Sequence, residues 1–292
     1  MNKTYTLNSI LPLLLMGYFL LGFKQVYVII NNRMGRNTMA DLENFIKELE
    51  VQEIQLPYSI KLMLDLKNEF NLKEIYSSNG LLEIIKANNP ESESMRTFIY
   101  EKIKEYLNAC TDCLLHSSDS CTRKVPGEGC LNSPLMLIGE GPGFDEDKLA
   151  KPFVGRAGQL LTTILNKLGI NRQKVYISNV VKCRPPMNRT PFVKEMKACS
   201  RNLELELTFI APKVIIALGS VPLNYFKPNS SIMRERGKWI YTRGFWVMPT
   251  FHPAYILRQQ GKALNKTKWD VWEDFNKALA KVRELCPEYS FN

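Results

Sequence analysis

The stretch LMLIGEGPGFDEDKLAKPFVGRAG, residues 135–158, contains the first predicted strand of an α/β domain and the first residues of a candidate site. An apolar strand runs into a glycine-rich turn and a helix follows, which is the order of a phosphate-binding α/β unit. The turn, however, has carboxylates where a phosphate cradle needs bare backbone amides and a lysine. They are Glu140, Asp145, Glu146 and Asp147. The stretch therefore predicts an α/β sheet whose first turn binds something other than a phosphate.

Four short β-rich runs follow Cys110, and helical stretches alternate with them. The runs are PLMLIG (134–139), KVYISNVV (174–181), KVIIALG (213–219) and GFWVMPTF (244–251). Between the first two, apolar residues recur at helical spacing up to a glycine stop, at Leu161, Ile164, Leu165, Leu168 and Gly169. Strand, helix and strand in this order predict a three-layer α/β/α domain with a mostly parallel central sheet.

Residues 40–108 have a different texture and predict a small N-terminal helical extension. The first helix is indicated by apolar side chains at Leu42, Phe45, Ile46 and Leu49. A further helix is predicted over residues 95–110. We therefore divide the chain into a hydrophobic N-terminal segment (1–39), the helical extension (40–108) and the α/β domain (109–285).

The N-terminal segment contains ILPLLLMGYFLLGF, residues 10–23, a run without charges. The run is short for a membrane-spanning helix, which needs about 20 apolar residues, and no clear small-residue cleavage site follows it. Three interpretations stay open: a membrane anchor, an uncleaved signal-like segment, or upstream sequence included by a wrongly chosen start. We favour the third, with Met34 or Met39 as the start, and expect a cytoplasmic protein.

The composition indicates a basic protein with free thiols. The 39 lysines and arginines exceed the 29 aspartates and glutamates, which leaves a formal net charge of +10. Such an excess suits a polyanionic partner, because neutralising phosphates releases condensed counterions. Seven cysteines are too few and too irregularly spaced for a disulfide scaffold in a chain of 292 residues. A reducing compartment is therefore favoured, with thiols as candidate metal or cluster ligands.

Three loops that follow predicted strands have polar groups at the same edge of the sheet. They are residues 139–143, 179–186 and 250–253. In open parallel sheets, ligands bind beyond the carboxyl ends of the strands, so we expect these loops to line one crevice. The alternative for the first loop is a tight turn followed by a capped helix, without a ligand.

The crevice would combine Phe153, Asn179, His252 and a carboxylate, a set suited to holding a planar pyrimidine and breaking its bond to a sugar. The amide of Asn179 donates and accepts along a pyrimidine edge, and so distinguishes uracil from cytosine. Breaking an N-glycosidic bond leaves positive charge on the sugar and negative charge on the base. A carboxylate stabilises the first or orients the attacking water, while His252 hydrogen-bonds the second.

The motifs GEGPGFDED…PFVGRAGQLL, VYISNVVKCRPPMNR and FHPAYILR resemble the successive motifs of family 4 uracil-DNA glycosylases, the iron–sulfur members of that superfamily. The resemblance extends from about Cys110 to about Phe275 and keeps the family's motif order. It implies a DNA-repair enzyme that flips uracil out of DNA and hydrolyses its glycosidic bond, leaving an abasic site. The alternative is a catalytically inactive DNA-binding module of the same fold.

Carried over residue by residue, the resemblance implies a role for each motif position. Glu140 and Gly141 would line the uracil pocket, with Glu140 as the carboxylate that orients water. Phe153 would stack on the base, Asn179 would read its edge, and His252 would contact a uracil oxygen during catalysis. The alternatives are a core position for Phe153 and a helix-capping role for His252.

The acidic pair of the first motif includes Glu146, which the resemblance implies crowds the 5-position, where thymine has a methyl group. The sequence departs from the family at Ala150, where glycine is common. It also departs over residues 113–134, although RKVPGEG (123–129) keeps the outline of the family's run. These departures concern the local geometry of the loops.

Cys110 and Cys113 form a C-x-x-C pair, and Cys183 and Cys199 follow far downstream. By spacing alone, the C-x-x-C pair could be a redox site, a zinc site or a chance occurrence. Four thiols together suit either zinc or an iron–sulfur cluster. The resemblance implies a [4Fe–4S] cluster with all four as ligands. The remaining thiols lie outside this pattern, although the first two are near enough in sequence to substitute for a ligand; they are Cys121, Cys130 and Cys286.

Basic residues in two loops are the predicted DNA contacts. We expect Arg184, Arg189 and Arg258 to lie against phosphates. The gap left by the flipped base would be filled by one of Tyr255, Ile256 and Leu257. The expected partner is single- or double-stranded uracil-containing DNA, bound by a monomer with no obligate protein partner.

Overall fold

The four predicted strands form the parallel core of one sheet in the computed structural model, which describes residues 93–292. They are β2 (Leu135–Gly139), β3 (Tyr176–Asn179), β4 (Val214–Leu218) and β6 (Phe245–Thr250). β2 pairs in parallel with β3 and with β4, and β4 pairs in parallel with β6. All four strand predictions are confirmed, and the strand ends that bear the candidate site lie at one edge.

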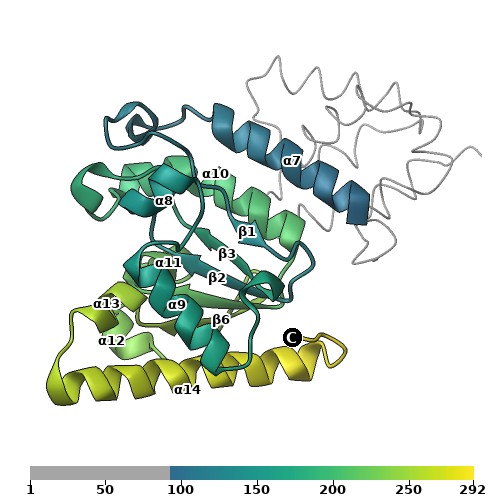
Figure 1. Ribbon diagram of the computed structural model, residues 1–292, viewed down its shortest axis with the longest axis vertical. Coiled ribbons are helices and arrows are strands. Elements are labelled where there is room, and N and C mark those ends of the chain that lie inside the picture. The colour runs from purple at the N-terminus through teal and green to yellow at the C-terminus, as the bar shows by residue number, and fades with distance from the viewer. Residues whose placement is uncertain (1–92) are drawn as a thin grey trace, which may run out of the picture. The chain divides into compact units, whose positions relative to one another are not determined.

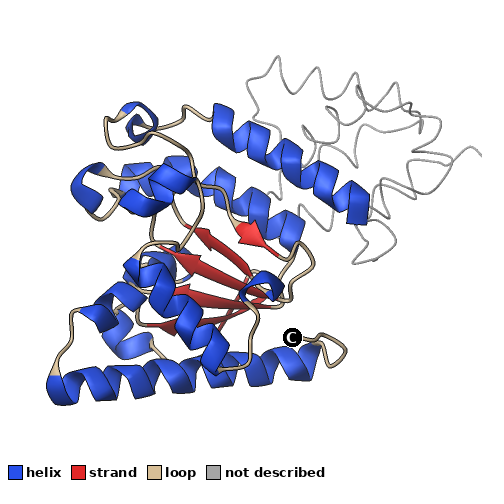
Figure 2. Ribbon diagram, viewed as in Figure 1, coloured by secondary structure: helices blue, strands red, loops and turns tan. Residues whose placement is uncertain are grey.

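Two short strands, which the sequence did not predict, complete the sheet. β1 (Glu128–Gly129) pairs antiparallel with β3, and β5 (Ile240–Thr242) pairs antiparallel with β6. The resulting order is β1-β3-β2-β4-β6-β5. Figure 2 shows the twisted sheet between helices on its two faces. The predicted α/β class with a mostly parallel sheet is confirmed.

The helices follow the order expected for an α/β domain (Figure 1). The α-helices are α7 (Glu93–Ala109), α8 (Phe144–Leu149), α9 (Arg156–Lys167), α10 (Val193–Ile210), α11 (Ser220–Phe226), α12 (Ile232–Glu235), α13 (Pro253–Leu257) and α14 (Gly261–Leu285). Short 3-10 turns are η2 (Leu114–Ser117), η3 (Arg172–Lys174) and η4 (Pro186–Asn188).

Alternation along the strands divides the core into two layers. Leu135 and Leu137 face the cluster that contains the buried side chains of α9 and α14. Met136 and Ile138 face the opposite cluster, which includes apolar residues of α10 and α11. Successive strand side chains point to opposite faces, and burying each of these side chains contributes about 1.5–3 kcal/mol. The predicted three-layer arrangement follows from this pattern.

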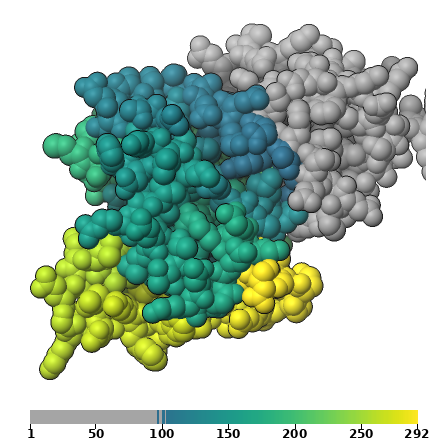
Figure 3. All heavy atoms as spheres, viewed as in Figure 1, coloured from purple at the N-terminus to yellow at the C-terminus, as the bar shows by residue number. Residues whose placement is uncertain are grey.

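The predicted helix between β2 and β3 is α9. Leu161 and Leu165 have no exposed surface, and the helix gives way at Gly169, whose φ of 71° lies in the left-handed region. Beyond α14 the chain returns to the domain, where Phe291 is buried and its carbonyl accepts a hydrogen bond from Asn171. In the space-filling view these last residues, in yellow, lie against the rest of the domain (Figure 3).

The helix predicted over residues 95–110 is α7. It packs against α10, and Ile103 and Leu107 are fully buried. The other predictions for the N-terminal part, including the apolar run at 10–23 and the starts at Met34 or Met39, lie outside the described residues. No helix within residues 93–292 combines the length and apolar character needed to span a bilayer. The division of the chain at residues 39 and 108 stays a prediction.

Candidate functional site

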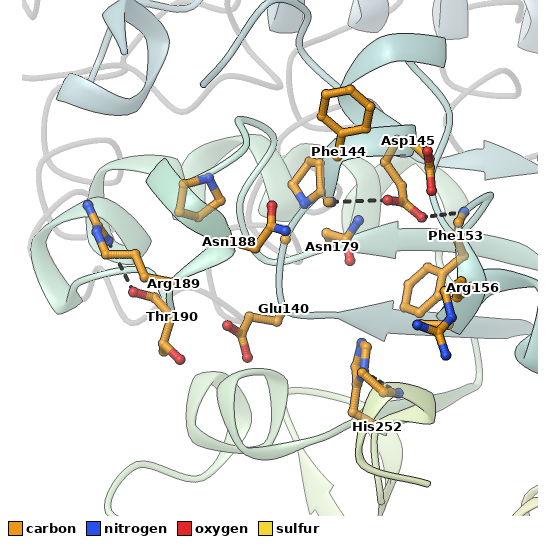
Figure 4. Close-up of a pocket in the computed structure, with 18 of the residues that line it drawn as sticks. Glu140, Phe144, Asp145, Phe153, Arg156, Asn179, Asn188, Arg189, Thr190 and His252 are labelled. Carbon is orange, nitrogen blue, oxygen red and sulfur yellow. Dashed lines mark hydrogen bonds between the residues drawn. The ribbon is translucent and has the colours of Figure 1, made fainter. Parts of the chain in front are cut away.

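A pocket of about 550 Å³ opens at the carboxyl ends of β2, β3 and β6 (Figure 4). It is lined by residues from all three predicted loops, so their expected convergence is confirmed. The six residues predicted to contact a base all lie in its wall. They are Glu140, Gly141, Glu146, Phe153, Asn179 and His252.

Asn179, the last residue of β3, presents an unused hydrogen-bonding atom to this pocket. Its side chain is 2 % exposed, and its Oδ1 is buried without a hydrogen-bond partner. A buried amide oxygen left unpaired costs about 1–3 kcal/mol, so the arrangement is expected where a ligand supplies the missing donor. This orphaned atom is the clearest sign that the pocket recognises a polar molecule.

Phe153 forms a second wall of the pocket, beside Asn179. The residue has a left-handed backbone with φ of 53°, and its ring lies 5.6 Å from that of His252. Gly139 makes room for this arrangement, because a Cβ there would lie 2.4 Å from the Phe153 ring and 2.5 Å from Asn179 Oδ1. The aromatic face and the amide edge therefore meet at a point where the sheet itself has no side chain.

His252 has a defined tautomer because of its place at the start of α13. Its Nδ1 accepts a hydrogen bond from the backbone N–H of Ala254 at 3.1 Å. Burial, with a smaller effect of Arg258, lowers the pKa of His252 to about 4. The ring is therefore neutral near pH 7 and has its proton on Nε2, where it serves as a donor. The alternative capping role is real, and it leaves the second ring nitrogen available to a ligand.

Glu140 follows β2 directly and lies across the opening from His252 (Figure 4). Burial raises the pKa of Glu140 above its ordinary value, against the opposing effects of a hydrogen bond with Thr190 and the charge of Arg258. Its backbone carbonyl accepts a hydrogen bond from Val181 at 3.1 Å. A half-buried carboxylate on a fixed backbone is suited to orienting a water molecule or facing a cationic centre.

Glu146 also lines the pocket, but its carboxylate is committed to the protein backbone. Oε1 accepts from the N–H groups of Val154 and Gly155 at 2.9 and 2.8 Å, and Oε2 accepts from Gly143 at 3.1 Å. These contacts tie the glycine-rich turn to the loop that bears Phe153. The predicted crowding of the uracil 5-position by Glu146 stays a prediction, while the contacts give this residue the task of holding two pocket loops together.

The remaining acids of the turn do not share one role. Asp147 is 4 % exposed and accepts hydrogen bonds from Thr122 N, Thr122 Oγ1 and Arg123 N, outside the pocket wall. Asp145 is exposed at the pocket rim. Asp147 is therefore held away from the pocket, because a buried carboxylate must be satisfied by nearby donors.

The arginines predicted to contact DNA differ in their interactions with the rest of the protein. Arg189 forms a bidentate pair with Glu195 at 2.6 and 2.8 Å, which balances its charge. Arg184 donates to Asn188 at 2.7 Å and lies over the Phe144 ring. Arg258 is exposed and lines the pocket. Phosphate contact by each of them stays a prediction.

Of the three candidate wedge residues, one is exposed and the other two pack against the protein. Ile256 is 2 % exposed and belongs to the core, and Tyr255 packs on Phe251 with ring centroids 4.8 Å apart. Leu257 is 43 % exposed. The wedge assignment therefore narrows to Leu257.

The pocket also contains residues that the sequence analysis missed. Asn188, Thr190 and Arg156 line it, and Thr190 interacts with Glu140. Asn188 has a left-handed backbone with φ of 54°. An asparagine directly after Pro-Pro-Met was the available signal, because asparagine is the usual non-glycine residue in that conformation.

The four thiols predicted as ligands lie on the α10 face of the sheet, where two of them contact Asn202. Asn202 Nδ2 donates to Cys110 Sγ at 3.4 Å and to Cys199 Sγ at 3.6 Å. Cys183 and Cys199 belong to one buried apolar cluster, and the partly buried Cys113 packs against it. Thiols from separate segments, with N–H donors aimed at sulfur, suit a thiolate-bound group.

Two further observations qualify this thiol group. Within residues 93–292, no three Cys, His, Asp or Glu side chains converge tightly enough to hold a single metal ion. The thiol of Cys121 hydrogen-bonds that of Cys183. Cys121 therefore lies beside a predicted ligand, although the ligand pattern implied by the resemblance left it outside as a possible substitute.

Comparison with known proteins connects the pocket to a family. A family profile described as Uracil DNA glycosylase superfamily matches residues 126–276. A type-4 uracil-DNA glycosylase of Thermotoga maritima is 44% identical over 192 residues, which cover 65% of this chain and 97% of the relative.

Two archaeal relatives extend the similarity. A type-4 uracil-DNA glycosylase of Sulfurisphaera tokodaii is 44% identical over 196 residues, covering 64% of this chain and 84% of the relative. A type-4 uracil-DNA glycosylase of Pyrobaculum aerophilum is 40% identical over 168 residues, which cover 54% of this chain and 85% of the relative.

Proposed function

The chain belongs to the uracil DNA glycosylase superfamily, and on that premise we propose that it is a type-4 uracil-DNA glycosylase, which removes uracil from DNA by hydrolysing the N-glycosidic bond. One observation carries the proposal. The buried Oδ1 of Asn179 lacks a partner in a pocket walled by an aromatic ring and a neutral histidine.

Uracil satisfies this pocket and cytosine does not. Asn179 Oδ1 accepts the N3–H of uracil, and Nδ2 donates to O4. Cytosine offers an acceptor at N3 and an amino group at the 4-position, so both contacts would be mismatched. A site built to hydrogen-bond one edge rejects the wrong edge strongly, because its buried polar groups are then left unpaired.

His252 stabilises the leaving base. As the glycosidic bond lengthens, negative charge spreads over the uracil ring and its oxygens. The Nε2–H of a neutral imidazole donates to such an oxygen without first giving up its proton. Preorganised donors aimed at developing charge are worth several kcal/mol in a site that excludes water.

Glu140 acts on the sugar side of the bond. Its carboxylate orients a water molecule towards the anomeric carbon and stabilises the cationic sugar that forms. The base leaves with the bonding electron pair, the water oxygen bonds to the sugar, and the water proton passes to the carboxylate or to solvent. The uracil anion then takes up a proton from solvent. The products are free uracil and an abasic site.

The four thiols of Cys110, Cys113, Cys183 and Cys199 would hold a [4Fe–4S] cluster. When bound, the cluster supplies structural cross-linking among the segments that bear the thiols. Arg184 follows one of these thiols directly, so the anchored segment orients the basic loop. Cys121, which contacts Cys183, is the reserve thiol of this group.

We infer that the substrate is uracil in single- or double-stranded DNA. The net charge of +10 and the exposed Arg258 at the pocket rim support a polyanionic partner. A cytoplasmic location is consistent with the reduced thiols that the cluster requires, and we expect a monomer without an obligate protein partner.

The function is tested with a labelled oligonucleotide that contains one uracil, and a matched oligonucleotide with thymine in its place. We expect alkali-labile strand breaks at uracil and none at thymine. Tight binding of uracil-DNA without strand breaks would instead identify a DNA-binding module that lacks turnover.

A further inference from the structure

A buried ion pair lies directly behind the base pocket. Lys182 and Glu206 are each 1 % exposed, and Lys182 Nζ lies 2.6 Å from Glu206 Oε2. Removing two charges from water is expensive, and such a pair is often no more stabilising than two apolar side chains. Its presence therefore calls for an explanation other than stability alone.

The hydrogen bonds of Lys182 lead to the base-reading residue. Its Nζ donates to Ser178 Oγ at 2.6 Å and to the backbone oxygen of Asn179 at 2.9 Å, besides Glu206. An ammonium group has three protons, and all three are used. Two of the three bonds hold the last two residues of β3.

Glu206 completes the network from α10. Oε2 accepts from Ser178 Oγ at 2.5 Å, and Oε1 accepts from Gly127 N at 2.7 Å. Its two oxygens thus connect α10 to β3 and to the segment before β1. The charges of both side chains are matched at short distance, so the network has one preferred geometry.

The network acts on Asn179 through its backbone. Beyond Asn179 the chain turns, and Val180 N donates to Gly139 O at 2.9 Å. The Asn179 carbonyl is therefore held from one side by Lys182 while its Oδ1 has no protein partner. The direction of the free amide oxygen depends on this backbone contact.

We propose that Lys182, with Glu206 as its counter-charge, is a positioning residue that fixes Asn179 for recognition of the base. The inference rests on the proposed uracil-DNA glycosylase function. Lys182 does not line the pocket and is not a catalytic residue. Its backbone N–H also donates to Cys199 Sγ at 3.4 Å, so the same residue connects the base reader to the thiol group.

The test compares two isosteric changes on the same helix. Glu206→Gln removes the counter-charge of Lys182. Glu204, also on α10, forms an ion pair with Arg243, and Glu204→Gln removes that pair instead. Single-turnover cleavage of uracil-DNA should slow about 10- to 100-fold in Glu206→Gln and stay at the wild-type rate in Glu204→Gln. In an Asn179→Ala background, Glu206→Gln should have no further effect, because the residue that it positions is absent.

A second variant separates positioning from folding. Lys182→Met/Glu206→Met replaces the pair by apolar side chains and should recover thermal stability. Its cleavage of uracil-DNA should nevertheless stay about 10- to 100-fold slower than that of the wild-type protein, because the backbone carbonyl of Asn179 has lost the Lys182 donor. A stable double variant that cleaves at the wild-type rate would overturn the inference. The inference would also fail if Glu206→Gln slowed cleavage as much in the Asn179→Ala background as it does in the wild-type protein. A wild-type protein that fails to cleave uracil-DNA would instead refute the proposed function.

Discussion

The base pocket and the thiol group adjoin the same short segment, residues 179–183, yet they are built differently. Pocket residues are held by the backbone, as Glu146 is by three N–H groups and His252 by Ala254. Asn179 Oδ1, in contrast, has no hydrogen-bond partner in the described part of the protein. The thiols approach one another from distant segments through side-chain contacts with Asn202 and Cys121. The pocket is therefore a preorganised site, whereas the thiol group is assembled from segments far apart in the sequence.

This difference predicts that changes in the pocket alter chemistry, whereas changes in the thiol group alter metal content and stability. No cysteine is among the residues that line the pocket. Variants in each region therefore provide controls for the other.

The largest expected effect is that of Glu140→Gln. The amide keeps the shape of the side chain but loses its negative charge and its basicity, so cleavage should slow by about 10²–10⁴-fold. Binding of uracil-DNA should change little. Single-turnover rates and equilibrium binding, measured on the same substrate, separate the two effects. Wild-type cleavage by this variant would direct the search to Asp145, the other carboxylate at the rim.

Asn179→Asp should have the next largest effect. The change places an acceptor where uracil O4 needs a donor, and the buried mismatch costs about 1–3 kcal/mol. This corresponds to about 5- to 150-fold in rate. Selectivity for uracil over cytosine should narrow at the same time, as measured by single-turnover rates on matched oligonucleotides. A uniform loss on both bases would contradict a base-reading role.

Thiol variants should affect the pocket less. Cys110→Ala, Cys113→Ala and Cys199→Ala should each lose iron and visible absorption and should melt at lower temperature. The cleavage rate of the folded fraction should stay within about tenfold of wild type. Cys286→Ala is the matched control and should keep its iron. Zinc without iron in the wild-type protein would contradict the cluster assignment.

Cys183 offers a sharper version of the same test because Cys121 contacts it. Cys183→Ala should retain part of its iron, and Cys183→Ala/Cys121→Ala should retain none. Iron and sulfide analysis of both proteins measures the difference. Equal iron in the single and the double variant would show that Cys121 does not substitute.

The smallest expected effect is a shift in the pH profile. Burial raises the pKa of Glu140 above its ordinary value, so its carboxylate form is lost as the pH falls through that raised pKa. His252, with a pKa of about 4, stays neutral throughout this range. The acid limb of single-turnover cleavage should therefore have its midpoint above the ordinary pKa of a glutamate side chain. The limb should disappear in Glu140→Gln and persist in His252→Asn.

Much of the fold was predictable because local pattern and tertiary structure agree. Four apolar runs bounded by glycine or polar residues became the parallel strands, and α9 has the face that its leucine spacing indicated. The short edge strands β1 and β5 were not predictable. Two or three residues have no periodicity, and their pairing depends on neighbouring strands that the sequence does not place.

The site was predictable where a motif residue has one task. Asn179, Phe153 and His252 all line the pocket, as expected from strand ends that meet at one edge. The acidic turn was harder, because Glu140, Glu146 and Asp147 are chemically alike and differ only in which donors surround them. The Lys182–Glu206 pair could not be predicted for another reason: its two members lie 24 positions apart in the sequence, and no local pattern relates them.

Release of free uracil tests the central claim most directly. Uracil-DNA is incubated with excess wild-type protein or Glu140→Gln, and the free base is quantified chromatographically beside the fraction of DNA bound. The account predicts stoichiometric free uracil from the wild-type protein, and bound but largely intact DNA with Glu140→Gln. Equal release of free uracil by both proteins would contradict the assignment of Glu140, and no release by the wild-type protein would contradict the activity itself.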